Sequence, residues 1–92
     1  MADQTKWVDE DQYWRTNYRT RPYARGLEYD ALSGGYRYGY ESANRLRGSE
    51  WDDVEPDLQR DWDKYPHRGR STWQQVKDAV RDAWDRVTGV RA

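Results

Sequence analysis

Arginines and aromatic residues alternate between residues 13 and 26, in the stretch YWRTNYRTRPYARG, which contains no acid. Arginine contacts phosphate oxygens and aromatic rings stack on bases, so this composition can bind nucleic acid. The same side chains can stack on one another inside a single protein, or meet an acidic protein surface. The residues available for either role are Trp14, Arg15, Tyr18, Arg19, Arg21, Tyr23 and Arg25.

Acidic residues gather in a different part of the chain. Residues 49–65 carry a net charge of −5 and residues 13–25 a net charge of +4, whereas the whole chain of 92 residues carries −1. An acidic face repels phosphate, and this overall charge is not that of a typical nucleic-acid-binding protein. We therefore favour the structural interpretation of the basic stretch, with a protein contact or nucleic acid as alternatives. The acids that could meet its arginines are Asp52, Asp53, Glu55, Asp57, Asp61 and Asp63.

Candidates for catalysis are few. His67 is the only histidine and follows Pro66 in a turn, which is typical of a solvated side chain rather than a general base. The sequence has no cysteine, no serine in a G-x-S-x-G motif, no glycine-rich phosphate loop and no EF-hand calcium loop. Acid pairs such as those at residues 9 and 11 or 61 and 63 are typical of a solvated helix face. We expect no enzyme, no cofactor, and no catalytic or metal site.

The elements that would position these residues begin with a repeat. Residues 49–64 and 71–86 share the pattern W-x2-V-x3-[LV]-x3-W with an offset of 22 residues, and its spacings place the apolar positions on one helix face. We predict amphipathic helices over about 50–65 and 72–88. The aromatic core residues that they contribute are Trp51, Trp62, Trp73 and Trp84.

The ends and interior of these two helices carry further signals. Ser49 and Ser71 are the expected N-caps, Ser71 forming a capping box with Gln74, and Gly89 stands where the second helix should stop. Pro56 lies too deep in the first helix for a regular first turn, because its ring clashes with the carbonyl four residues before it. We therefore expect a kink or a restart at this proline.

The segment GGYRYGYESANRL, residues 34–46, has two interpretations. A stripe of apolar and small residues at helical spacing runs from Leu32 to Leu46 and predicts a helix over about 28–47. Gly35, Gly39 and Ala43 lie four residues apart on its edge, a spacing that lets another helix approach closely, within the chain or in a second chain. In the alternative, the glycines end a short helix near Leu32 and the rest is flexible.

These elements predict an all-α fold, a small three-helix bundle over residues 27–92 preceded by an aromatic-rich, partly irregular N-terminal arm over residues 1–26. The arm includes a helical turn around 9–18, and Trp7 and Trp14, seven residues apart, share a face with which the arm docks onto the bundle. A chain of this size buries a small core, so we also expect a homo-oligomer.

Composition indicates whether the chain folds and whether it enters a membrane. Mean hydropathy is −1.44, no apolar run is long enough to cross a membrane, and no apolar signal segment occurs at the start. Six tryptophans and eight tyrosines with a net charge near zero are not the composition of a disordered chain. We expect a folded, soluble, cytoplasmic protein that does not bind a membrane.

Four segments of the sequence together resemble a family of small uncharacterised bacterial proteins. They are YWRTNYRTRPY, GYRYGYESANRLRG, WDDVEPDLQRDW and WQQVKDAVRDAWDRV, which match the YWR-x2-Y-x2-RPY opening, the YRYG segment and the paired tryptophan-bounded helices of that family from Tyr13 to Val87. The resemblance implies a bacterial source and a role in stress tolerance, and it implies no particular activity or functional residue.

Two hypotheses for function follow. The first is a non-catalytic helical interaction or structural protein that self-associates, with a possible further protein partner, and that contributes to stress tolerance. The second is a nucleic-acid-binding module that uses the basic stretch over residues 13–25.

Overall fold

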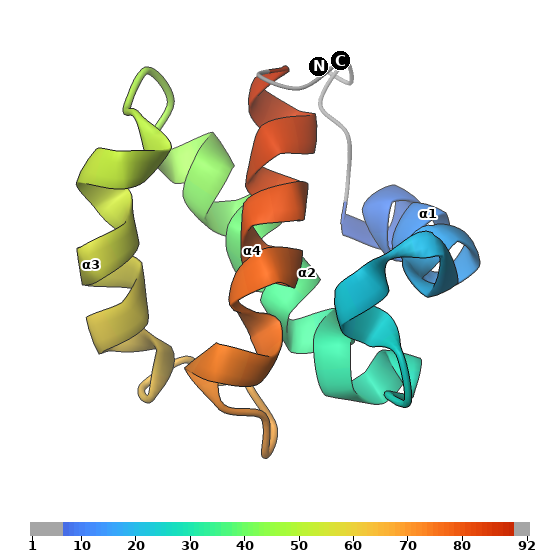
Figure 1. Ribbon diagram of the computed structural model, residues 1–92. Helices are drawn as coiled ribbons and strands as arrows, with labels where there is room; N and C mark the ends of the chain where they lie inside the picture. Colours follow the sequence, from blue (N-terminus) through green and yellow to red (C-terminus); the bar gives the residue numbers. More distant parts are fainter. Residues whose placement is uncertain (1–6, 90–92) are drawn as a thin grey trace.

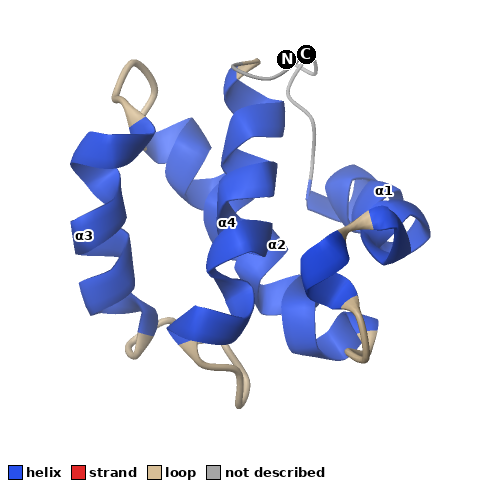
Figure 2. Ribbon diagram, in the orientation of Figure 1, coloured by secondary structure: helices blue, strands red, loops and turns tan. Residues whose placement is uncertain are grey.

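The computed structural model describes residues 7–89, and this part of the chain is helical with no strand (Figures 1 and 2). Four α-helices occur: α1 (Trp7–Asn17), α2 (Tyr29–Arg45), α3 (Trp51–Trp62) and α4 (Trp73–Thr88). Two short 3-10 turns, η1 (Tyr18–Thr20) and η2 (Pro22–Ala24), connect α1 to α2. The all-α prediction is confirmed, whereas the count of three helices is one short. Residues 1–6 of the predicted arm and 90–92 of the predicted bundle lie outside the described residues.

Helix α4 lies at the centre of the molecule (Figure 1). Helix α2 crosses behind it and makes the most extensive contact with it, α3 runs antiparallel to it on one side, and α1 with the two 3-10 turns lies on the other side. The core accordingly forms two clusters, one between α3, α2 and α4 and one between α1, the 3-10 turns, α2 and α4. None of the helices in residues 7–89 is long and apolar enough to cross a membrane.

The duplicated tryptophans pair across the antiparallel helices α3 and α4. Trp51, the first of α3, meets Trp84, the last of α4, with ring centroids 5.7 Å apart, and Trp62 meets Trp73 at 6.4 Å. The leading tryptophan of each helix is 8% exposed and the trailing one 1%, so each contact joins one leading and one more deeply buried trailing ring. The sequence repeat thus becomes two similar aromatic contacts at the two ends of the α3–α4 interface.

Small residues set the distance between α2 and α4. A Cβ atom at Gly39 would collide with the carbonyl oxygen of Val80 in α4, and one at Gly35 would lie 2.7 Å from the Cβ of Val76. Ala43 has no exposed surface. The stripe predicted from the glycine–tyrosine segment therefore lies in a helix and contacts α4 of the same chain, where a second chain does not reach it.

Of the two outcomes expected at Pro56, a kink or a restart of the helix, the structure excludes the restart. Helix α3 runs unbroken from Trp51 to Trp62 with the proline inside it, so it does not restart there. Its N-cap is Glu50 rather than Ser49, and no side chain caps it. The first turn is held by backbone bonds alone, since the amides of Asp53 and Val54 both donate to the carbonyl of Glu50.

The start of α4 lies one residue later than predicted. Thr72 is the N-cap and forms the capping box with Gln75, whose amide donates to Thr72 Oγ1 at 3.3 Å while its side-chain oxygen accepts from the Thr72 amide at 2.9 Å. The Ser71 hydroxyl instead donates to the carbonyl of Ala31 at 2.6 Å and so links this turn to α2. At the other end the prediction is confirmed, because Gly89 ends α4 in the left-handed conformation with φ of 76°.

Candidate functional site

The aromatic residues of the basic stretch lie mostly inside the fold. Trp14, 1% exposed, stacks on Tyr36 of α2 with ring centroids 4.4 Å apart and planes within 7°. Tyr18, 5% exposed, packs against Tyr29 at 5.3 Å. Rings buried in this way have no free face on which a base could stack.

The arginines of the same stretch lie over those rings. Arg21 is centred 5.5 Å from the Trp14 ring, and its Nε lies 3.4 Å from a carboxylate oxygen of Asp82 in α4. Arg15 lies over Tyr29 at 4.6 Å. The two remaining arginines are exposed: Arg19 lies over the ring of its neighbour Tyr18 at 5.7 Å, and Arg25 caps the second 3-10 turn.

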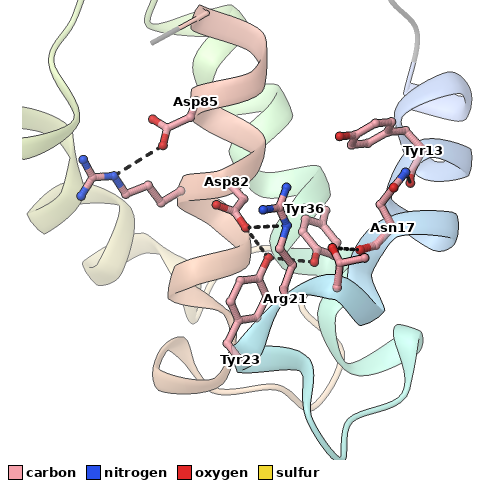
Figure 3. A network of polar contacts seen from close by, with 9 residues as sticks. Tyr13, Asn17, Arg21, Tyr23, Tyr36, Asp82 and Asp85 are labelled. Atoms are coloured by element: carbon pink, nitrogen blue, oxygen red, sulfur yellow. Dashed lines mark hydrogen bonds and ion pairs between the residues drawn. The ribbon is translucent and has the colours of Figure 1, made fainter. Parts of the chain in front are cut away.

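A chain of side-chain hydrogen bonds joins this segment to α2 and α4 (Figure 3). The Tyr23 hydroxyl donates to Asp82 Oδ2 at 2.6 Å and lies 2.9 Å from the Tyr36 hydroxyl. Because the single proton of Tyr23 goes to Asp82, the Tyr36 hydroxyl is the donor to Tyr23. The chain therefore runs from Tyr36 through Tyr23 to Asp82, which lies between Tyr23 and Arg21.

The two tyrosines of this chain are held in the neutral form. Burial raises the pKa of Tyr36 to about 12, and burial followed by the bond to Asp82 raises the pKa of Tyr23 well above its usual range. A hydroxyl that stays protonated and donates a hydrogen bond to a carboxylate acts as neither base nor nucleophile near neutral pH. The network links the arm segment to the core.

A second link holds α1 against the end of α4. Glu10 is buried at 4% exposure, and Arg86 of α4 donates from Nε to its carboxylate at 3.0 Å. The Arg86 guanidinium also lies 3.5 Å from the centre of the Tyr13 ring. Ion pair and ring contact together orient α1, which the sequence predicted only as a docked helical turn.

A pocket of about 510 Å³ opens between α1, the 3-10 turns and the C-terminal half of α4. It is lined by Tyr13, Trp14, Arg21, Asp82, Asp85, Arg86 and Gly89. Two arginines and two aspartates cancel in charge. The α4 residues of this pocket were missed from the sequence, where they belong to the polar stripe of an amphipathic helix and carry no signal that separates them from a solvated face.

The acidic side chains of α3 form a separate surface. The apolar stripe of this helix faces α4, so Asp52, Asp53 and Asp57 are exposed on its outer side. Arg60, on the same helix, pairs with Asp57 at 3.2 Å and Asp61 at 3.0 Å. The segment of residues 13–25 lies on the opposite side of α4 from α3 (Figure 1). Its arginine Arg21 pairs with Asp82 of α4 rather than with an acid of α3.

Other residues that could act in catalysis or bind a metal ion do not cluster in the part of the chain that the structure describes. His67 lies exposed in the turn after α3, with its ring 5.5 Å from the Tyr65 ring. Among residues 7–89, no three histidine, aspartate or glutamate side chains gather as a metal ion would require. No protein-family model, curated protein or solved structure matches the chain.

Proposed function

We propose that this chain is a non-catalytic interaction protein that associates with further copies of itself head to tail. The acidic outer face of α3 in one copy would dock onto the exposed arginines of residues 13–25 in the next. The observation that carries this proposal is that the two oppositely charged segments stay on opposite sides of α4 after folding (Figure 1), each exposed to solvent.

Charge is a better candidate than apolar contact for such an interface. Val8, 63% exposed, is the one large apolar side chain left open over residues 7–89, so these residues present no apolar patch. The small-residue stripe of α2 is already covered by α4. Exposed ion pairs contribute about 0.2–1 kcal/mol each, so several are needed and the association should be weak and sensitive to salt.

Burial of the arm's rings weighs against the nucleic-acid alternative. Single-stranded nucleic acid is held by aromatic faces on which bases stack, together with a basic groove. Trp14 and Tyr18 are buried, and Tyr23 is tied to Asp82 and Tyr36 through its hydroxyl. The exposed arginines that remain suit carboxylates as well as phosphates.

A charge-swap experiment tests the assembly. One variant lowers the net charge of residues 13–25 from +4 to 0 (Arg19→Glu with Arg25→Glu), and the other changes that of residues 49–65 from −5 to −1 (Asp53→Lys with Asp57→Lys). Sedimentation velocity at low salt should show wild-type oligomers that dissociate in about 0.3 M NaCl, and monomers for each variant alone. An equimolar mixture of the two variants should associate into pairs, because the unchanged α3 of the arm variant can dock onto the unchanged arm of the α3 variant.

A matched control makes the same two arginine-to-glutamate substitutions at other positions. Arg47→Glu with Arg70→Glu reverses two exposed arginines in loops outside the proposed interface, and it should leave the wild-type oligomers intact. A wild-type chain that stays monomeric at high concentration and low salt would refute the proposal. A mixture of the two swap variants that stays monomeric would refute the head-to-tail geometry. Binding of a single-stranded oligonucleotide that Arg19→Glu with Arg25→Glu abolishes would favour the nucleic-acid alternative.

A role in stress tolerance rests on the family resemblance alone. Deletion of the gene should lower survival of the source organism under desiccation or osmotic stress, and the wild-type gene should restore survival better than either charge-swap variant. Equal survival with and without the gene would remove this part of the proposal.

A further inference from the structure

A shallow pocket of about 170 Å³ lies between α1, α2 and the turn that follows α3. Three of the residues that line it carry cationic or potentially cationic groups: Arg15 of α1, Arg37 of α2 and His67 of the turn. Ser33 of α2 adds a hydroxyl to the same wall. These four side chains come from three segments that are distant in sequence, so only the fold brings them together.

Both arginines of this pocket are oriented by contacts with neighbouring side chains. Arg15 lies over the Tyr29 ring and donates through one terminal nitrogen to Asp11 at 3.2 Å. Arg37 lies over the Trp7 ring, 5.8 Å from its centre, and donates through Nε to Glu41 at 2.9 Å. An arginine has five N–H groups, so each guanidinium held in this way keeps further donors for a ligand.

One acid, Asp11, shares the lining, and its carboxylate is already engaged on both sides. Oδ1 accepts from the Tyr29 hydroxyl at 2.7 Å, and Oδ2 accepts from Arg15 at 3.2 Å. Glu41, the partner of Arg37, similarly accepts from the Tyr65 hydroxyl at 2.7 Å. Hydrogen bonds from hydroxyls and guanidinium groups spread the negative charge of these carboxylates and reduce the repulsion that they exert on an anion.

The position of His67 is determined by a close backbone approach. Gly34, which also lines the pocket, has no Cβ, and a Cβ there would collide with the carbonyl oxygen of His67. The turn can therefore lie directly against α2 beside Ser33 and Arg37. A glycine at this place lets His67 line the same pocket as the two arginines.

We infer that this pocket binds a compact phosphate-type oxyanion, inorganic phosphate or the phosphate of a small monoester. Planar guanidinium donors, an imidazole and a hydroxyl converging on a space of this size match the several acceptor oxygens of a tetrahedral anion. The inference is independent of the proposed assembly, whose test changes neither the arginines nor the histidine of this pocket.

The test is a titration of the full-length chain, followed by NMR signals of the His67 imidazole and of the Arg15 and Arg37 Nε–H groups, and by calorimetry. The probes are inorganic phosphate and glycerol 3-phosphate, with sodium chloride at matched ionic strength. Both phosphates should give saturable shifts at these three residues, and chloride should give none. Shifts that chloride reproduces, or that do not saturate, would overturn the inference.

Variants separate a specific site from general attraction by a basic surface. Arg37→Gln and His67→Gln should each weaken phosphate binding at least about tenfold, because each removes a charge-assisted donor. Arg47→Gln removes the same charge from an exposed position outside the pocket and should leave binding unchanged. Equal weakening by Arg47→Gln and Arg37→Gln would overturn the inference.

Two further arms decide which source of phosphate the pocket accepts. Vesicles of phosphatidylcholine with phosphatidate present the group on a membrane, and a short single-stranded DNA presents it in a polymer. Binding of either one while inorganic phosphate and glycerol 3-phosphate leave the three residues unchanged would overturn the inference. Binding of the small phosphates, with Gly34→Ala weakening it by displacing the turn, would support it.

Discussion

Gly39→Ala is the sharpest test of how α2 and α4 pack. The Cβ atom that this substitution adds would collide with the carbonyl oxygen of Val80 and lie 3.0 Å from the Cβ of Ala83. The first of these atoms belongs to the backbone of a central helix and cannot rotate away. Helix α2 must therefore move off α4, at the interface with the most extensive contact in the protein.

The expected size of the effect follows from two opposing terms. Overpacking at a well-packed site costs about 1–3 kcal/mol, and a backbone obstacle places Gly39 at the upper end of that range. Replacing glycine by alanine inside a helix returns about 1 kcal/mol of helix propensity. The net loss of unfolding free energy is about 2 kcal/mol, which for a chain of this size lowers Tm by about 8–16 °C.

Thermal unfolding followed by circular dichroism at 222 nm measures this loss, with urea unfolding as a second assay. Asn44→Ala, on the exposed face of the same helix, is the control and should leave Tm unchanged or raise it, since alanine favours helix there. Gly35→Ala should cost less than Gly39→Ala, because its nearest obstacle, the Cβ of Val76, is 2.7 Å away and the Val76 carbonyl oxygen 3.3 Å, whereas the Val80 carbonyl oxygen lies closer to Gly39. A Gly39→Ala protein that melts at or above the wild-type temperature would show that the close approach of α2 and α4 is not as described.

Three further outcomes follow from single contacts. Thr72→Ala removes the capping box of α4 and should lower the urea-derived unfolding free energy by about 1 kcal/mol, and an unchanged value would contradict Thr72 as the N-cap. Glu10→Gln weakens the salt bridge to α4 and should speed amide hydrogen exchange in α1 more than in α3, whereas equal changes would deny that this bridge holds α1 locally. Burial raises the pKa of Tyr36 and Tyr38 to about 12 each. An unfolded tyrosine ionises near pH 10, so the unfolded state loses these protons first, and stability is complete below about pH 10 and declines above it. Ionisation of each of these tyrosines should lower the unfolding free energy of the protein by about 2 kcal/mol by about pH 12. Tyrosinate absorbance that rises in full before the helical circular dichroism signal falls would contradict this.

Local sequence patterns were enough to place three of the helices. The tryptophan repeat and the Leu32–Leu46 stripe predicted helices within a few residues of α2, α3 and α4, because an apolar face repeated at helical spacing has one compact way to bury itself. The left-handed residue that ends α4 was also readable, since glycine adopts that conformation without strain.

Features that depend on contact with a distant segment of the chain could not be predicted from the local sequence. The N-cap of α4 was assigned to Ser71, which has the right chemistry, but its hydroxyl is taken by the carbonyl of Ala31 forty residues earlier. Helix α1 was predicted only as a helical turn around 9–18 within an irregular arm. Its stability comes from Trp14 against Tyr36 and from Glu10 against α4.

One part of the candidate site was also predicted from the sequence, and the other part was not. The sequence singled out the basic-aromatic stretch, and the structure places Trp14 and Tyr18 in the core with Arg21 joined to Asp82. The pocket with Arg37 and His67 had no counterpart in the sequence-based hypotheses, because its donors come from three separate segments.

The order of amino acids alone determined an all-helical chain, an aromatic core and two oppositely charged segments, since periodicity and composition act within a few turns of helix. Only the tertiary structure decided that the glycine stripe meets α4 of the same chain, that the duplicated tryptophans pair end to end, and that the charged segments remain on opposite sides. Those outcomes depend on which surfaces exclude water together, and that is a property of the packed chain rather than of any one segment.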